Sequence, residues 1–331
     1  MKEFHETAGV DVSKLTLDAW LHRKEIHCQV ENNAAGFEKL EKWIRQNCKG
    51  SRSTLLCFEH TGLYSLQLAI YLAEKKIPFS MISALEIKKS LGVVRGKNDK
   101  VDAKRIAEYA YLRRQTLTMT VLPSEAIQKL KELLSFRERM VTQRAGYKAS
   151  FKEFSHVFPK SHNRELFNIH ENLIGELTHH INAVEEKIKE IIEENPEIAR
   201  QYRLITSVVG IGLIVAAQLI VSTNCFTAFS NSRKFACYCG VAPFKHQSGT
   251  SINSKARVSQ LANKKIKALL DRSASTAILY DPELKQFYNR RVSEGKTKRS
   301  TLNIIRNKII HRVFAVVKRE TPYVKLHRFA A

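Results

Sequence analysis

Two carboxylates stand three residues apart in the stretch RGKNDKVDAKRIAEYA, which runs from residue 95 to residue 110. Asp99 and Asp102 open an apolar-periodic run, so on the first turn of a helix their side chains point the same way. The cations around them are Lys97, Lys100, Lys104 and Arg105. An acidic pair inside a basic field suits carboxylates that bind a divalent cation close to bound phosphate. The pair also suits a helix start, with Asp99 as N-cap and Asp102 completing a capping box.

The composition is that of a folded, strongly basic protein. The chain has 331 residues, and 55 Lys and Arg against 32 Asp and Glu give a net charge of +23. This length predicts two domains with a connector, and this charge is best balanced by nucleic acid. Because no apolar run approaches membrane-spanning length and the start MKEFHETAGV lacks a signal peptide's apolar region, we expect a cytoplasmic, nucleoid-associated protein without a membrane partner.

The N-terminal third of the chain predicts an α/β sheet. Residues 7–12, 15–21 and 26–30 read as an antiparallel meander of short strands. There follow a helix over 36–48, a strand over 53–58, a helix over 63–75, a strand over 77–83 and a helix from about residue 101. This β-β-β-α-β-α-β-α order is that of a ribonuclease-H-like sheet whose later strands are parallel. Asp11 would then lie on the first strand and Glu59 at the carboxyl end of the fourth, at the edge where open α/β sheets bind ligands.

An aspartate in the otherwise apolar strand AGVDVS needs a partner, because burying a lone charge is costly. A cation shared by Asp11, Glu59, Asp99 and Asp102 would be that partner. Oxygen ligands without His or Cys favour Mg²⁺ or Mn²⁺, and two such ions about 4 Å apart can assist phosphodiester cleavage. Taken singly, Asp11 also fits a solvent-facing residue and Glu59 a charge at a strand end.

Three stretches, GVDVSK, FEHTGLY and VRGKNDKVDAKRIAEYA, closely resemble the N-terminal domain of the DEDD-type insertion-sequence transposases. That family is headed by insertion sequence one-ten and includes the Piv-like invertases, and its N-terminal domain is similar to RuvC Holliday-junction resolvases. The resemblance places the family's acidic tetrad on Asp11, Glu59, Asp99 and Asp102. It further implies guidance by a structured RNA, and a homodimer or homotetramer whose composite sites join one subunit's carboxylates to another's serine.

Residues 116–195 predict a helical connector. Apolar residues at three- and four-residue steps from Ile127, and a heptad rhythm from Phe167 to Ile191, indicate two long coiled-coil helices. The second helix is rich in glutamate and is therefore a poor surface for nucleic acid. The helices fold back either on a second subunit, as a dimerisation arm, or on each other as an intramolecular hairpin.

Pro196 begins a third, mainly helical region. Gly210 and Gly212 lie between two apolar helical stretches, which is the pattern of a helix-hairpin-helix whose backbone approaches a phosphate. A structural turn in a buried helix pair fits nearly as well. A helix is expected from Asn231 to about Gly240, followed by a polar loop that leads into a basic helix.

The polar loop resembles the C-terminal domain of the same family, whose catalytic serine sits in a Ser-Gly pair. The resemblance assigns that role to Ser248, which would attack a DNA phosphate and form a covalent phosphoserine link. From the residues alone, Ser251 and Ser254 are equal candidates. Downstream the chain departs from the family pattern, since Gln260, Ala262 and Lys267 stand where Lys, Gly and Arg are usual.

Residues 285–328 carry thirteen Lys or Arg against two Glu. An apolar stripe from Leu302 to Val317 predicts a helix with a core face and a cationic face, suited to salt-sensitive backbone binding. Across the chain, the residues expected to contact nucleic acid are Arg95, Lys97, Lys100, Lys104, Arg105, Gly210, Gly212, Lys245, Lys255, Arg257, Lys264 and Lys265.

Together these features predict a ribonuclease-H-like catalytic domain over 1–115, a coiled-coil connector over 116–195 and a C-terminal transposase domain over 196–331. The predicted function is a DNA transposase or recombinase that uses Mg²⁺-bound carboxylates and Ser248, with DNA and a structured guide RNA as partners. One alternative is a metal-dependent junction nuclease without a covalent intermediate. The other is a nucleic-acid-binding protein without catalysis, in which the acids are helix caps.

Overall fold

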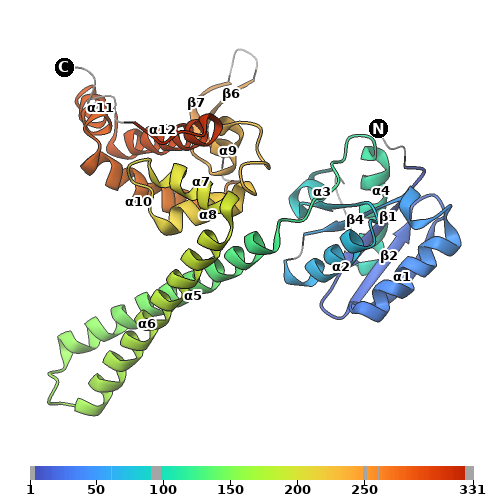
Figure 1. The fold of residues 1–331 in the computed structure, drawn as a ribbon, viewed down its shortest axis with the longest axis horizontal. Helices are drawn as coiled ribbons and strands as arrows, with labels where there is room; N and C mark the ends of the chain where they lie inside the picture. Colours follow the sequence, from blue (N-terminus) through green and yellow to red (C-terminus); the bar gives the residue numbers. More distant parts are fainter. Residues whose placement is uncertain (1–3, 61, 91–97, 249–251, 260, 325–331) are drawn as a thin grey trace. The chain divides into compact units, whose positions relative to one another are not determined.

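The chain forms two compact units, Met1–Leu122 and Pro123–Ala331 (Figure 1). The structure, a computed structural model, describes residues 4–60, 62–90, 98–248, 252–259 and 261–324, and the backbone alone of 245–248 and 252–255. The predicted connector over 116–195 falls almost wholly in the second unit. In the described part of the chain, no helix is long and apolar enough to cross a membrane.

A five-stranded mixed sheet forms the centre of the first unit, in the order β3-β2-β1-β4-β5. Its strands are β1 (Glu6–Val12), β2 (Thr16–Leu21), β3 (Ile26–Glu31), β4 (Thr54–Glu59) and β5 (Phe79–Ile82). The β1–β2 and β2–β3 pairs are antiparallel, whereas β1–β4 and β4–β5 are parallel. This topology confirms the predicted ribonuclease-H-like α/β fold, with a meander followed by parallel crossovers.

Helices cover both faces of this sheet. On one face, α1 (Ala34–Asn47) and α2 (Leu63–Glu74) pack against alternate strand residues such as Val10 and Phe58. On the other face lie α3 (Ala84–Ser90) and α4 (Asp99–Arg113), which pack against Leu55 and Cys57. The sequence patterns did not predict the short helix α3. Because side chains alternate along a strand, the two faces divide each strand's residues between two cores.

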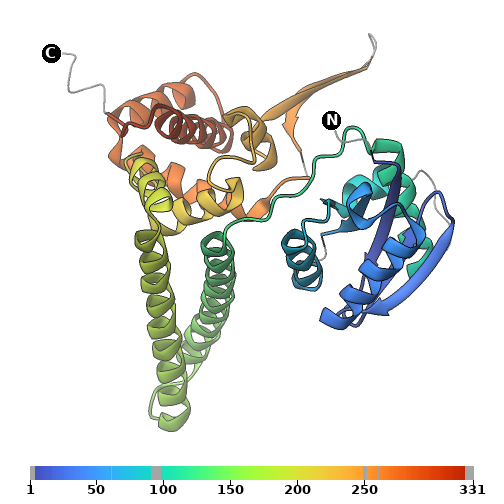
Figure 2. The same ribbon diagram turned by 45° about the vertical axis from the view of Figure 1, so that its right-hand side comes forward.

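The second unit begins with two long antiparallel helices, α5 (Glu125–Val157) and α6 (Arg164–Glu194) (Figure 2). They fold back on each other within one chain, and an Arg137–Glu185 ion pair of 2.6 Å links them. Ile127 on α5 and Ile188 on α6 contribute to the core that the unit's remaining helices share. The base of this hairpin is therefore part of the C-terminal core.

Six further helices and a two-stranded ribbon complete the described part of the second unit. They are α7 (Pro196–Thr206), α8 (Leu213–Thr223), α9 (Ser232–Tyr238), β6 (Pro243–Ser248), β7 (Ile252–Val258), α10 (Lys264–Tyr280), α11 (Pro282–Ser293) and α12 (Lys298–Arg319). The expected polar loop is thus wrong, because β6 and β7 pair antiparallel. Cross-strand pairing stabilises strands that polar composition alone does not indicate.

The basic C-terminal region is less uniformly exposed than its charge suggests. Two of the arginines on α12 are withdrawn into ion pairs: Arg306, which is 5% exposed, contacts Asp271, and Arg312 contacts Asp281 at 2.6 Å. A buried arginine needs such a partner because an unpaired buried charge is costly. These cations therefore hold α12 against α10 and the start of α11 and are not available to a phosphate backbone.

Candidate active site

Asp11 lies one residue before the end of β1, half-buried. Glu59 is the last residue of β4, and the parallel register pairs Val10 with Phe58, one residue earlier on each strand. Since Val10 and Phe58 belong to the core under α1 and α2, the next residues of both strands turn to the opposite face. The strands therefore place Asp11 and Glu59 side by side on the face that α4 covers.

Helix α4 brings the other two carboxylates to this face. Asp99 and Asp102 both lie in its first turn, but the N-cap is Asn98, whose side chain accepts a hydrogen bond from the Lys100 amide at 3.0 Å. The prediction of Asp99 as N-cap is thus wrong by one residue, because Asn98 takes the extended backbone that a cap requires. Asp99 therefore does not cap the helix. The Asp102 carboxylate forms an ion pair with the Arg105 guanidinium, with 2.9 Å between oxygen and nitrogen.

A glycine lets α4 lie directly on β1. A Cβ at Gly9 would stand 2.2 Å from the Ala103 carbonyl oxygen and 2.2 Å from the Ala107 amide nitrogen. Both atoms belong to the helix backbone, which cannot rotate away as a side chain can. Thr7, two residues before, donates its hydroxyl to the Ala107 carbonyl at 2.9 Å. This close approach fixes where the first turn of α4 lies relative to the end of β1.

A fifth carboxylate, Asp18, lies beside Asp11 beneath the surface and was not among the predicted site residues. It is the cross-strand partner of Asp11 and is buried at 4% exposure. Its oxygens accept hydrogen bonds from His27 Nε2 at 2.8 Å and from Gln29 Nε2 at 3.1 Å. Both donors lie on β3 and fix the position of the Asp18 carboxylate. Asp18 therefore adds a negative charge beside Asp11.

The electrostatics show that these carboxylates influence one another. Burial, and then the negative charges of Asp99, Asp102, Asp18 and Glu59, raise the pKa of Asp11 to about 6. Like charges gathered at one place disfavour ionisation of each other. The structure thus brings the four predicted acids, Asp11, Glu59, Asp99 and Asp102, within electrostatic range, and together they form a carboxylate tetrad.

The carboxylate tetrad fits a hard cation by its chemistry. Among the residues that the structure describes, no three Asp, Glu, His or Cys side chains are grouped closely enough to coordinate one metal ion. The donor set is nevertheless composed of oxygen atoms, which Mg²⁺ and Mn²⁺ prefer. Burial and then the charges of the neighbouring acids raise the pKa of Asp11, and a bound cation would offset both effects by stabilising the ionised carboxylates.

The raised pKa predicts how stability depends on pH without metal. Because the folded-state pKa of about 6 exceeds the ordinary value of 3.8, Asp11 favours the folded state below pH 4, and this contribution is lost as pH rises through 6. Asp11→Asn should therefore stabilise the metal-free protein at pH 8 by on the order of 1 kcal/mol, allowing for solvent screening of a half-exposed group. Urea unfolding in EDTA at pH 4 and pH 8 measures this, and equal effects at both pH values would contradict it.

Several predicted nucleic-acid contacts flank the tetrad. Lys100 and Lys104 place their ammonium groups 5.8 and 5.2 Å from the centre of the Trp20 ring. Arg105, by contrast, is engaged with Asp102. Arg95 and Lys97 lie outside the described residues. Two lysines on an aromatic face beside the acids form a cationic border to the site.

In the second unit, the backbone places Ser248 at the end of β6, paired in register with Ile252. Ser254 lies within β7, opposite His246, and Ser251 lies outside the described residues. Lys245 and Lys255 are on the same ribbon, described by backbone alone. Ser248 thus belongs to a different unit from the carboxylate tetrad.

The remaining predicted contacts of this unit differ from one another. Arg257 and Lys264 are exposed, whereas Lys265 forms an ion pair with Glu138 of α5. Gly210, between α7 and α8, has φ of +94° and would place a Cβ 2.4 Å from the Ser273 carbonyl of α10. Packing therefore accounts for this glycine without a phosphate. Gly212 caps α8, and a Cβ there would meet no atom within 4 Å.

Comparison with known proteins gives two family models and several relatives. The model described as Transposase IS116/IS110/IS902 family matches residues 202–289, and a second, named for the DEDD type of IS110 and described as Transposase, matches residues 8–154. The pilin gene-inverting proteins of Moraxella bovis and Moraxella lacunata are both 28% identical over 323 residues, covering 96% of this chain and 97% of theirs.

Two further similarities cover less of the chain. An insertion element IS110 protein of Streptomyces coelicolor is 30% identical over 141 residues, which are 43% of this chain and 34% of that protein. The structure of T. thermophilus RuvC in complex with a Holliday junction substrate is 12% identical, with a TM-score of 0.25 over 35% of this chain and 99% of that one.

Proposed function

Since the chain belongs to the IS116/IS110/IS902 family of transposases, enzymes that cleave and rejoin DNA, we propose that its carboxylate tetrad and Ser248 act together in one strand-transfer reaction. The observation that carries this proposal is the convergence of acids from β1, β4 and α4 on one face of the sheet, where burial and then the neighbouring negative charges raise the pKa of Asp11. Acids that served only as helix caps or strand-end charges would not gather on one face of the sheet. The convergence therefore supports a phosphoryl-transfer site.

The tetrad would hold Mg²⁺ or Mn²⁺. When bound, such an ion neutralises charge that develops on a phosphate during cleavage. Gly9 allows α4 to pack directly on β1, so that the first turn of α4, with Asp99 and Asp102, lies near the strand ends. Asp18, the cross-strand partner of Asp11, adds a further negative charge there. Lys100 and Lys104, held over Trp20, would bind the DNA backbone next to the scissile phosphate.

Ser248 would be the nucleophile. Its Oγ attacks phosphorus and gives its proton to solvent, while the bond from phosphorus to the leaving DNA oxygen breaks and that oxygen takes up a proton to become a free hydroxyl. The other strand end stays joined to serine as a phosphodiester. A hydroxyl from another DNA end then attacks the same phosphorus and releases serine. Bond energy is conserved through both steps, so strands can be rejoined without a cofactor that supplies energy.

The two groups belong to different units, and we propose that assembly completes the site. In a homodimer or homotetramer, the catalytic domain (1–115) of one subunit would act with the C-terminal domain (196–331) of another. The connector (116–195), through the exposed parts of its coiled-coil-like helices, would join the subunits. The turn at Gly212 would approach the DNA backbone as part of a helix-hairpin-helix, and a structured RNA would select the DNA sequence by base pairing.

A strand-transfer assay tests this proposal. Protein purified with its bound RNA is mixed with a plasmid that carries the ends of the element and a target, in Mg²⁺ or in EDTA. We expect recombinant joints with Mg²⁺, and their loss with EDTA or after ribonuclease treatment. The Moraxella relatives are named for gene inversion, so the plasmid should report inversion as well as insertion. Cleaved DNA without joined products would instead favour the metal-dependent nuclease.

A further inference from the structure

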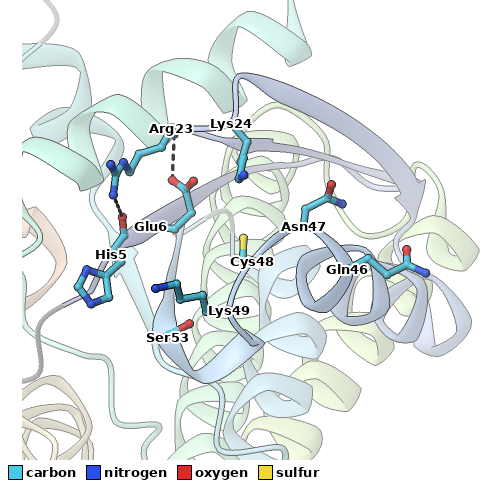
Figure 3. A pocket seen from close by; sticks show the side chains of 9 residues that line it. All are labelled: His5, Glu6, Arg23, Lys24, Gln46, Asn47, Cys48, Lys49 and Ser53. Carbon is cyan, nitrogen blue, oxygen red and sulfur yellow. Dashed lines mark hydrogen bonds between the residues drawn. The ribbon is translucent and has the colours of Figure 1, made fainter.

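A cavity of about 500 Å³ lies in the first unit, at the end of the sheet opposite the carboxylate tetrad (Figure 3). Its lining comes from the start of β1, the β2–β3 turn and the segment from the end of α1 to β4. Glu6, at its centre, is five residues before Asp11 on the same strand, which corresponds to about 17 Å of extended chain. The cavity is therefore separate from the proposed active site.

The cavity carries an excess of positive charge. Arg23, Lys24 and Lys49 line it, all exposed, against one carboxylate, that of Glu6. In the part of the chain that the structure describes, neither Lys24 nor Lys49 forms an ion pair. Figure 3 shows the two lysines entering from different segments around the Glu6 carboxylate. Cations that converge without protein partners are suited to bind a phosphate.

Glu6 gives the cavity a second, different recognition group. It is 7% exposed, and its Oε1 accepts hydrogen bonds from the amides of Thr7 at 2.9 Å and Arg23 at 3.0 Å. These bonds fix the carboxylate on the cavity wall. In the described structure, Oε2 has no hydrogen-bond donor, so it remains able to accept one. A phosphate alone would be repelled by this oxygen, whereas the amino group of a base would be bound by it.

We propose that this cavity binds one unpaired nucleotide of a single-stranded nucleic acid, with the phosphate on Lys24 and Lys49 and the amino edge of the base on Glu6. The cavity volume lies within the range of small-ligand sites and exceeds what a phosphate needs. Unpaired nucleotides expose their base edges, which duplexes hide. The inference builds on the proposed action on nucleic acid and adds a site remote from the cleavage chemistry.

Fluorescence anisotropy with labelled ten-residue homopolymers of C and U, as RNA and as DNA, tests the site on the full chain. Lys24→Glu and Lys49→Glu should each weaken binding of oligo-C about tenfold. Each should also make the slope of log affinity against log salt concentration shallower, by about the amount expected for one lost phosphate contact. Lys42→Glu is the matched control, since Lys42 is exposed on α1 and does not line the cavity. It should change affinity no more than about twofold, as expected for a screened surface charge. Thermal unfolding checks that all variants are folded.

The base contact is tested separately. Cytosine has an amino group that uracil lacks, so the wild-type chain should bind oligo-C about tenfold more tightly than oligo-U. Glu6→Gln retains Oε1 and replaces Oε2 by a donor, so it should remove this preference. Whichever of the RNA and DNA oligomers binds more tightly identifies the natural source of the nucleotide.

Either of two results would overturn the proposal. In the first, Lys24→Glu and Lys49→Glu lose no more affinity for oligo-C than Lys42→Glu does. In the second, the wild-type chain binds oligo-C and oligo-U equally well. Failure of the proposed function would appear differently. It would show as a wild-type chain that forms no strand-transfer products, whatever the affinities of these variants.

Discussion

Asp11→Asn is expected to lower the rate of strand cleavage about a thousandfold or more. The variant should still fold and still bind DNA. The substitution keeps the size of the side chain but removes the negative charge at the centre of the carboxylate tetrad, where β1 places it beside Glu59. Loss of a metal-binding carboxylate removes several kcal/mol of transition-state stabilisation, and about 4 kcal/mol corresponds to this factor. Cleavage of a labelled DNA substrate in Mg²⁺ measures the effect.

A second pair of variants tests whether loss of cleavage requires removal of a charge in the carboxylate tetrad or follows from removal of any surface charge. Glu59→Gln should reduce cleavage comparably to Asp11→Asn, whereas Glu74→Gln, at the exposed end of α2, should leave it unchanged. Full cleavage by Asp11→Asn would support a non-catalytic role for the acids. In that case the family's activity would have to reside elsewhere in the chain.

Ser248→Ala should eliminate the covalent protein–DNA adduct and reduce strand joining by at least about a thousandfold, because no other group of the site replaces the lost nucleophile. The adduct is detected by denaturing electrophoresis of labelled DNA after quenching. Ser254→Ala is the matched control, since Ser254 lies on the paired strand of the same ribbon and should retain the adduct.

The outcome of Ser248→Ala also decides between two enzymes. A nuclease that uses only the carboxylate tetrad and metal needs no serine, so its cleavage would be unaffected. An adduct that persists in Ser248→Ala and disappears in Ser254→Ala would identify Ser254, on β7, as the nucleophile. Either result would remove Ser248 from the mechanism while leaving the tetrad's role intact.

The sheet and its acids could be predicted because their signals are local. The strand AGVDVS, the buried strand ending at Glu59 and the helix starting near Asp99 each follow from apolar periodicity, and parallel crossovers bring their ends together. Asp18 was missed for a physical reason. Alternation assigns it to one face of β2, but only the tertiary structure shows that α4 covers that face and that His27 and Gln29 satisfy its carboxylate.

Other features depended on contacts that sequence patterns do not contain. The cap of α4 moved from Asp99 to Asn98 because either side chain can cap a helix and the backbone decides between them. The ribbon around Ser248 has a polar sequence that indicates a loop, yet its two strands pair. Arg306 looked like part of a cationic surface, but its partner Asp271 lies 35 residues away and holds it in the interior.

Titration of Mn²⁺ into the metal-free protein, followed calorimetrically, tests most directly whether the tetrad is a cation site. The wild-type chain should bind Mn²⁺ with release of protons from Asp11 below pH 6, while Asp11→Asn and Glu59→Gln should bind at least about tenfold more weakly. Glu74→Gln should match the wild type. Mn²⁺ binding of equal strength in all four proteins would show that these carboxylates do not hold the metal.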